Sequence, residues 1–78
     1  MLTLEEAKDL ITETIYGAAM TPDLYIFTVF PESPVADLRT VNKQNGKIGW
    51  MEFSKWCEEV DANRVTRIHT KLSKDAST

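Results

Sequence analysis

The chain has one cysteine, Cys57, and one histidine, His69, and these are the only two residues that could pair as a thiol nucleophile and an imidazole base. No third orienting residue and no glycine-rich oxyanion turn accompanies them. One Cys and one His also fall short of the about three or four ligands that zinc requires. We therefore expect no enzyme, no metal and no cofactor, with Cys57 packed on a helix and His69 on a strand edge.

Acidic residues form two adjacent pairs, Glu5–Glu6 and Glu58–Glu59. Neighbours on a helix point about 100° apart, so neither pair places a general acid beside a general base. A solvated helix face is the simpler interpretation. The glycines form no phosphate loop and no dinucleotide fingerprint, and no small-molecule substrate is evident.

Basic residues supply the only argument for nucleic acid. Residues of the C-terminal segment could form a basic sheet face together with earlier cations, and Trp50 lies nearby in sequence for stacking. The candidates are Arg64, Arg67, His69 and Lys71, with Arg39, Lys43 and Lys47. The net charge of −3 argues against nucleic acid as the main partner, so this interpretation is kept as the alternative.

Charge is distributed unevenly, with −6 over residues 1–37 and +3 over residues 38–78. Two interpretations are open. The first is a solvated acidic helix beside a mixed-charge sheet. The second is a two-signed surface that orients a protein partner by electrostatic complementarity.

The elements that must position these residues belong to one small domain. We expect residues 1–73 to form it and 74–78 to be a polar tail. No apolar run approaches about 18 residues, so no membrane-spanning helix is expected. One cysteine excludes an internal disulfide, and the first residues lack signal-peptide character, so a cytoplasmic protein is predicted. A mature exported form with its signal removed is the alternative.

The N-terminal residues predict a helix, because Thr3 and Glu6 have the spacing of a capping box. Apolar residues then recur at helical spacing, and the helix is expected to run to Tyr16 or Ala19. Residues 24–30 are aromatic and β-branched and lie between prolines, which indicates a strand. A loop follows at residues 31–34.

Residues 37–51 predict a β-hairpin. A four-residue loop over 43–46 pairs Val41 with Ile48 and Arg39 with Trp50. In this loop the Asn42 side chain begins a type I turn, and Gly46 takes the left-handed position. Residues 52–60 then switch to helical period. Residues 64–72 fit strand or helix, and we predict a strand because they are rich in Thr and β-branched residues.

These elements give an α+β fold of order α-β-β-β-α-β, with a small, mostly antiparallel sheet and both helices on one face. The strand at 24–30 is apolar on both sides, so one apolar face stays uncovered. We expect a non-enzymatic protein-binding module, with this face occupied by another protein or by a second copy in a homodimer. The predicted binding residues are Tyr25, Phe27 and Val29, rimmed by Arg39 and Trp50.

The helix with Glu-Glu-Ala-Lys, the aromatic strand and the turn Val-Asn-Lys-Gln-Asn-Gly-Lys-Ile resemble the PepSY-type domain pattern. They also resemble small immunity and inhibitor proteins of bacteria and phages. The resemblance covers residues 4–51, and residues 52–72 add a helix and a strand outside the PepSY pattern. It implies a helix packed on an antiparallel sheet and an inhibitor or immunity-type role, and no catalytic residue carries over.

Overall fold

Five antiparallel strands and two helices make up the computed structural model, which describes residues 1–30 and 37–68. The strands lie in the order β4-β3-β2-β1-β5. The α+β class and the small antiparallel sheet are therefore confirmed. The predicted loop at 31–34 and the boundary of the polar tail fall outside the described residues. In chain order the elements are α1 (Leu4–Asp9), β1 (Thr14–Met20), β2 (Leu24–Phe30), β3 (Asp37–Asn42), β4 (Ile48–Met51), α2 (Phe53–Asp61) and β5 (Thr66–Ile68).

The capping box at the start of α1 is confirmed. The Thr3 hydroxyl accepts a hydrogen bond from the Glu6 amide at 3.1 Å, and the Thr3 amide donates to a Glu6 carboxylate oxygen at 2.8 Å. The predicted length of this helix is wrong, because α1 ends at Asp9 and Leu10 is its C-cap. Neither helix in the described ranges has the length and apolar character needed to cross a membrane.

Residues 14–20 form the strand β1, which the predicted element order lacks. β1 pairs with β2 on one side and with β5 on the other, so both of its backbone edges are hydrogen-bonded. Its β-branched Thr14 and Ile15 suit a strand better than a helix. A bulge between Ile15 and Gly17 shifts the register of β1 against β2.

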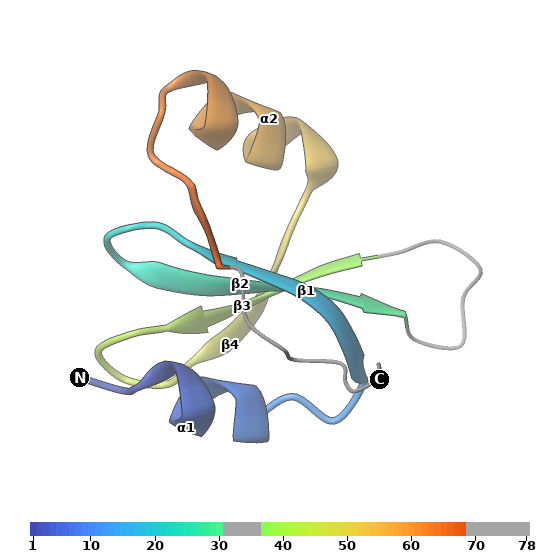
Figure 1. Cartoon of the computed structure of the whole chain (residues 1–78), viewed down its shortest axis with the longest axis vertical. Helices are drawn as coiled ribbons and strands as arrows, with labels where there is room; N and C mark the ends of the chain where they lie inside the picture. The colour runs from blue at the N-terminus through green and yellow to red at the C-terminus, as the bar shows by residue number, and fades with distance from the viewer. Residues whose placement is uncertain (31–36, 69–78) are drawn as a thin grey trace.

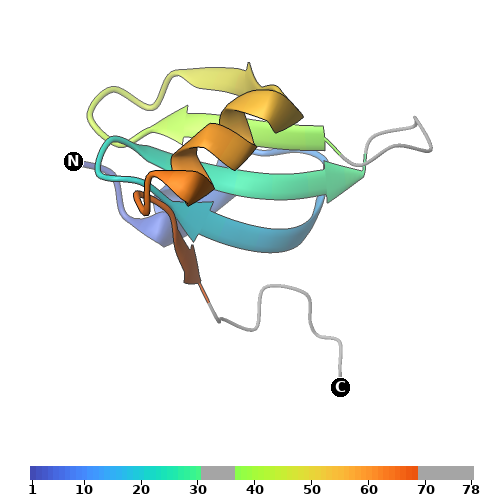
Figure 2. The same ribbon diagram turned by 90° about the horizontal axis from the view of Figure 1, so that it is seen from above.

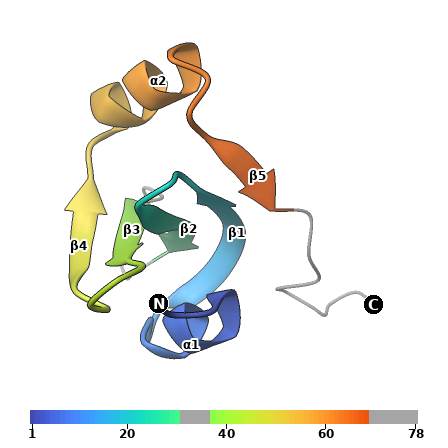
Figure 3. The same ribbon diagram turned by 90° about the vertical axis from the view of Figure 1, so that its left-hand side faces the viewer.

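The two helices lie on opposite faces of the sheet, which corrects the prediction that both pack on one face (Figures 1 and 3). α1 packs on the face formed by Tyr25, Phe27, Val29 and Val41, where Ala7 is fully buried with them. α2 connects β4 to β5, the two outermost strands, which run parallel. Helical crossovers between parallel strands are nearly always right-handed, and this places α2 on the face opposite α1 (Figure 2).

The predicted hairpin register is confirmed. Val41 pairs with Ile48 and Arg39 with Trp50. The Asn42 side-chain oxygen accepts from the amides of Gln44 and Asn45 at 2.8 and 3.2 Å. Gly46 has a φ of 73°, which glycine adopts without the steric cost of a Cβ. The turn therefore forms through its own local contacts, as its sequence indicates.

The C-terminal predictions are confirmed where the structure describes them. α2 at 53–61 lies one residue beyond the predicted helix at 52–60. β5 covers residues 66–68 of the predicted strand at 64–72, and residues 69–72 fall outside the described part. Thr66 and Ile68 point to the same face, because they pair with Met20 and Ala18 of β1.

Candidate protein-binding edge and the cleft under α2

The predicted binding residues of β2 lie in the hydrophobic core. Tyr25, Phe27 and Val29 are 8%, 0% and 0% exposed, because α1 covers the face on which they lie. The Tyr25 hydroxyl donates to the Leu2 carbonyl at 2.9 Å, which ties the N-terminal segment to the sheet. The prediction of an uncovered aromatic face is therefore wrong, and these three side chains are not available to a partner.

Arg39 and Trp50 lie on the same face, at its β4 edge. The Arg39 guanidinium donates from Nε and Nη2 to Oε2 of Glu13, at 3.1 and 2.8 Å. Its central carbon lies 3.8 Å from the centre of the Trp50 ring. The hydrogen bonds from Arg39 lower the pKa of Glu13, against the opposing effect of burial. The sequence prediction missed Glu13, which falls within the helix predicted to run to Tyr16 or Ala19 and lies 26 residues from its partner.

β4 is an outer strand of the sheet, and no other strand among residues 1–30 and 37–68 pairs with its second edge. The Asn42 amide donates to the Lys47 carbonyl at 2.9 Å, which sets the alternation of bonded and non-bonded pairs between β3 and β4. By this alternation Gly49 and Met51 direct their amides and carbonyls toward β3. Ile48 and Trp50 direct theirs away from the sheet. Their side chains are also 41% and 56% exposed.

The end of α2 is held by a charge cluster. The Glu59 carboxylate is buried and accepts hydrogen bonds from Nε and Nη2 of Arg64 at 2.9 and 2.7 Å. Lys55 Nζ lies 3.3 Å from Glu59 Oε2. The Arg64 hydrogen bonds, with a smaller contribution from Lys55, lower the pKa of Glu59 to about 2. The backbone closes the helix with a Schellman motif, in which Asn63 donates to Val60 and Arg64 donates to the Glu59 carbonyl.

The described residues do not gather the predicted nucleic-acid residues on one surface. Arg64 is paired with Glu59 at the end of α2. Arg67 lies on the α2 face, since it pairs with Ala19, whereas Arg39 lies on the α1 face. His69 and Lys71 fall outside the described residues, and so does the predicted place of His69 on a strand edge.

Cys57 is half-buried on α2 as a free thiol. Across residues 1–30 and 37–68, no cluster of three or more His, Cys, Asp or Glu side chains could hold a metal ion.

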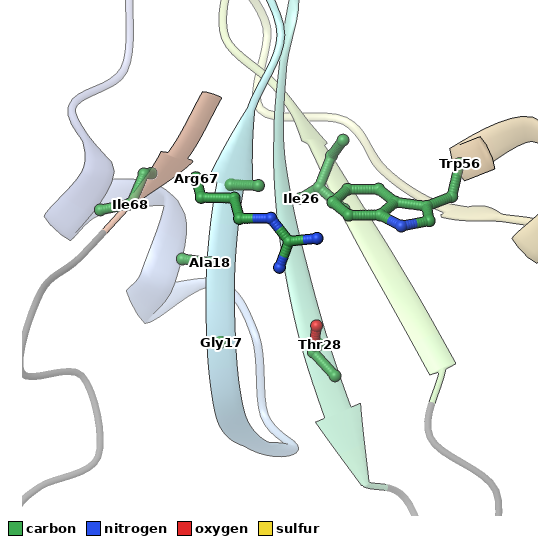
Figure 4. Close-up of a pocket in the computed structure, with 8 residues that line it drawn as sticks. Gly17, Ala18, Ile26, Thr28, Trp56, Arg67 and Ile68 are labelled. Carbon is green, nitrogen blue, oxygen red and sulfur yellow. The ribbon is translucent and has the colours of Figure 1, made fainter. Parts of the chain in front are cut away.

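A cleft lies between α2 and the strands β1, β2 and β5 (Figure 4). Trp56 of α2 and Arg67 of β5 form its walls, with the Arg67 guanidinium carbon 5.8 Å from the centre of the Trp56 ring. Its floor is made of small residues, including Gly17 and Ala19. The apolar stripe of α2 is only partly covered, because Phe53 and Val60 remain 73% and 40% exposed.

No family model, no curated protein and no solved structure matches this chain. The resemblance to PepSY-type domains and to immunity or inhibitor proteins stays a prediction.

Proposed function

We propose that this protein is a non-enzymatic protein-binding module, and that β4 is its docking edge for an extended segment of another protein. One observation carries the proposal. Ile48 and Trp50 combine backbone groups that point away from the sheet with exposed apolar side chains. Addition of a strand uses both features, because main-chain hydrogen bonds give affinity and alternate side chains give specificity.

The composition of β4 supports this assignment. Proteins usually protect an outer strand with charged residues or proline, because its open backbone otherwise pairs with other chains. β4 has the sequence Ile-Gly-Trp-Met and contains neither. β5, at the other edge of the sheet, carries Arg67 in its centre. The unprotected edge is therefore the better candidate for docking.

The charges that flank β4 define the chemistry of the partner. Lys47 precedes the strand and Glu52 follows it, and both are exposed. An antiparallel segment with apolar residues at alternate positions would match Ile48 and Trp50. Such a segment is best oriented by an acidic residue near Lys47 and a basic residue near Glu52.

A second copy of β4 has the same flanking charges but is too short to be the preferred occupant. Four residues extend over about 13 Å, at about 3.3 Å per residue. Two such strands bury far less than the about 1,000 Å² of a stable interface. A longer segment of another protein can continue past the strand. An inhibitor or immunity-type role, in which this segment belongs to a toxin or an enzyme, is the narrower form of the proposal.

The test uses a synthetic extended peptide with alternating apolar residues, an acidic residue at one end and a basic residue at the other. We expect titration followed by NMR to shift the amides of Ile48 and Trp50 and to slow their hydrogen exchange. Trp50→Lys should weaken binding at least about tenfold, or about 1.4 kcal/mol. Phe53→Ser is the matched control, because it removes an exposed aromatic side chain outside the edge.

Equal losses in Trp50→Lys and Phe53→Ser, or unchanged exchange at Ile48 and Trp50, would contradict docking at β4. Sedimentation equilibrium should show a monomer. If the protein is a dimer and Trp50→Lys dissociates it, the occupant of β4 is a second copy of the chain and not a segment of another protein.

A further inference from the structure

The cleft under α2 combines a cation, Arg67, with an apolar wall formed by Trp56. The described residues include three arginines. Arg39 holds Glu13 and Arg64 holds Glu59, each through two donors, whereas Arg67 has no carboxylate in ion-pair contact among residues 1–30 and 37–68. Figure 4 shows its guanidinium extending over β1 toward Trp56. Arg67 is thus the one arginine in this part of the chain whose donors are open to a ligand.

We propose that this cleft binds a carboxylate attached to one apolar group. The Arg67 guanidinium would hold the carboxylate through two parallel hydrogen bonds, which is the geometry that arginine supplies and lysine does not. The apolar group would lie against the Trp56 ring and Ile26. The Thr28 hydroxyl, which faces the cleft in Figure 4, offers a further donor.

The size of the cleft limits the ligand. Its volume is about 200 Å³. Sites for drug-sized ligands and cofactors occupy about 300–1,000 Å³, so a nucleotide is too large. One aromatic or aliphatic group with its carboxylate is the suitable size. This chemistry comes either from a free small acid or from the C-terminal residue of a peptide chain.

The small residues of the floor make the space available. Gly17 pairs with Thr28, and both belong to the α2 face. A Cβ at position 17 would lie 3.6 Å from Thr28 Oγ1, which is an ordinary contact. A larger side chain is therefore compatible with the strand but would occupy the floor. A larger side chain at Gly17 therefore fills the cleft without changing the charge of Arg67.

The experiment titrates the full chain with 3-phenylpropionate and with its uncharged amide, 3-phenylpropionamide, followed by NMR. We expect the acid to shift the amides of Gly17, Ala19 and Thr28 and the Trp56 indole signal. The amide should bind at least about tenfold more weakly. A peptide ending in a free phenylalanine carboxylate, compared with its C-terminally amidated form, then distinguishes a chain terminus from a free acid.

Three variants decide the assignment. Arg67→Gln should weaken binding of the acid at least about tenfold, and Gly17→Val should abolish it by filling the floor. Lys8→Gln is the control, because it removes a cation from α1, on the other face. Equal binding of acid and amide, full binding by Arg67→Gln, or no shift with either probe would overturn the proposal. The cleft and β4 are separate, so these results leave docking at β4 to its own test.

Discussion

The guanidinium carbon of Arg39 lies 3.8 Å from the centre of the Trp50 ring, across the pairing of β3 with β4. This is a non-hydrogen-bonded pair, in which the side chains of antiparallel strands approach most closely. Because Arg39 also holds Glu13, the stack links the outer strand to the segment between α1 and β1. The docking edge therefore presents a tryptophan whose position is set by two other side chains.

The first prediction concerns the ion pair behind this stack. Both side chains are largely buried, at 16% exposed for Glu13 and 22% for Arg39. Glu13→Ala should lower the free energy of unfolding by about 2 kcal/mol, because it removes two charge-assisted hydrogen bonds and leaves the largely buried Arg39 without a carboxylate partner. Urea unfolding followed by circular dichroism measures this loss.

A double-mutant cycle of Glu13→Ala and Arg39→Ala tests whether the effect belongs to the pair. We expect a coupling energy of about 1–2 kcal/mol. The pair of Glu5 and Lys8 provides the comparison, because the Glu5 side chain is 74% exposed, and its expected coupling is below about 0.5 kcal/mol. Equal coupling in the two pairs would show that burial does not strengthen the Arg39 contact.

The second prediction is a loss of stability in acid. The pKa of Glu59 in the folded protein is about 2, below its ordinary value of 4.5. The unfolded chain therefore takes up a proton first as the pH falls. The contribution of this carboxylate to stability is present above pH 4.5 and is lost between 4.5 and about 2. Urea unfolding over this range should show a declining midpoint.

Glu59→Gln should make that decline shallower, since it removes one of the carboxylates whose pKa the fold lowers, while Glu13 still titrates. Glu52→Gln is the matched control, because Glu52 lies at the other end of α2 and its side chain forms no cap hydrogen bond. The control should keep the wild-type slope. A Glu59→Gln protein with an unchanged acid slope would contradict the assignment.

The third prediction concerns Asn63, which has a φ of 60° at the end of α2. This conformation is unfavourable by about 1–2 kcal/mol for most residues with a Cβ, by less for asparagine, and hardly at all for glycine. Asn63→Ala should therefore lower the free energy of unfolding by about 1 kcal/mol, and Asn63→Gly should keep or raise it. The reverse order in urea unfolding would show that the Asn63 side chain itself is needed.

The elements with local signals were predictable from the sequence. The β3–β4 turn depends on Asn42 and Gly46, and the α1 cap depends on Thr3 and Glu6, so each signal lies within a few residues. The strand β2 was equally clear, because every residue after Leu24 is aromatic or β-branched.

The role of residues 14–20 was not predictable in the same way. Ile15 and Ala18 fit helical spacing, but pairing with β2 and β5 decides their conformation, and these strands lie farther along the chain. The error also affected the candidate site. With β1 in the sheet, α2 crosses several strands on the face opposite α1. The aromatic face of β2 is therefore covered by α1. The pair of Glu13 with Arg39 depends on the same long-range arrangement.

The last prediction compares two glycines at which substitution by alanine should affect stability differently. Gly46 is the one glycine with a positive φ, and a Cβ there would lie 3.4 Å from a methyl group of Leu2. Gly46→Ala should cost about 1–2 kcal/mol through backbone strain alone. Gly17 has room for a Cβ and lies in a strand, where glycine is unfavourable by about 0.5–1 kcal/mol relative to alanine. Gly17→Ala should therefore be neutral or stabilising.

Both alanine variants remove the same backbone freedom from the unfolded chain, so the difference between them reports the folded state. Thermal and urea unfolding of the two proteins, side by side, measures it. Gly46→Ala should also disturb the contact of Leu2 with the turn and thereby the hydrogen bond from the Leu2 amide to the Lys43 carbonyl, which is 2.7 Å long in the native protein. Faster hydrogen exchange at Leu2 in Gly46→Ala, with no change there in Gly17→Ala, is the expected result. If both variants lose the same stability, the turn does not require its left-handed glycine.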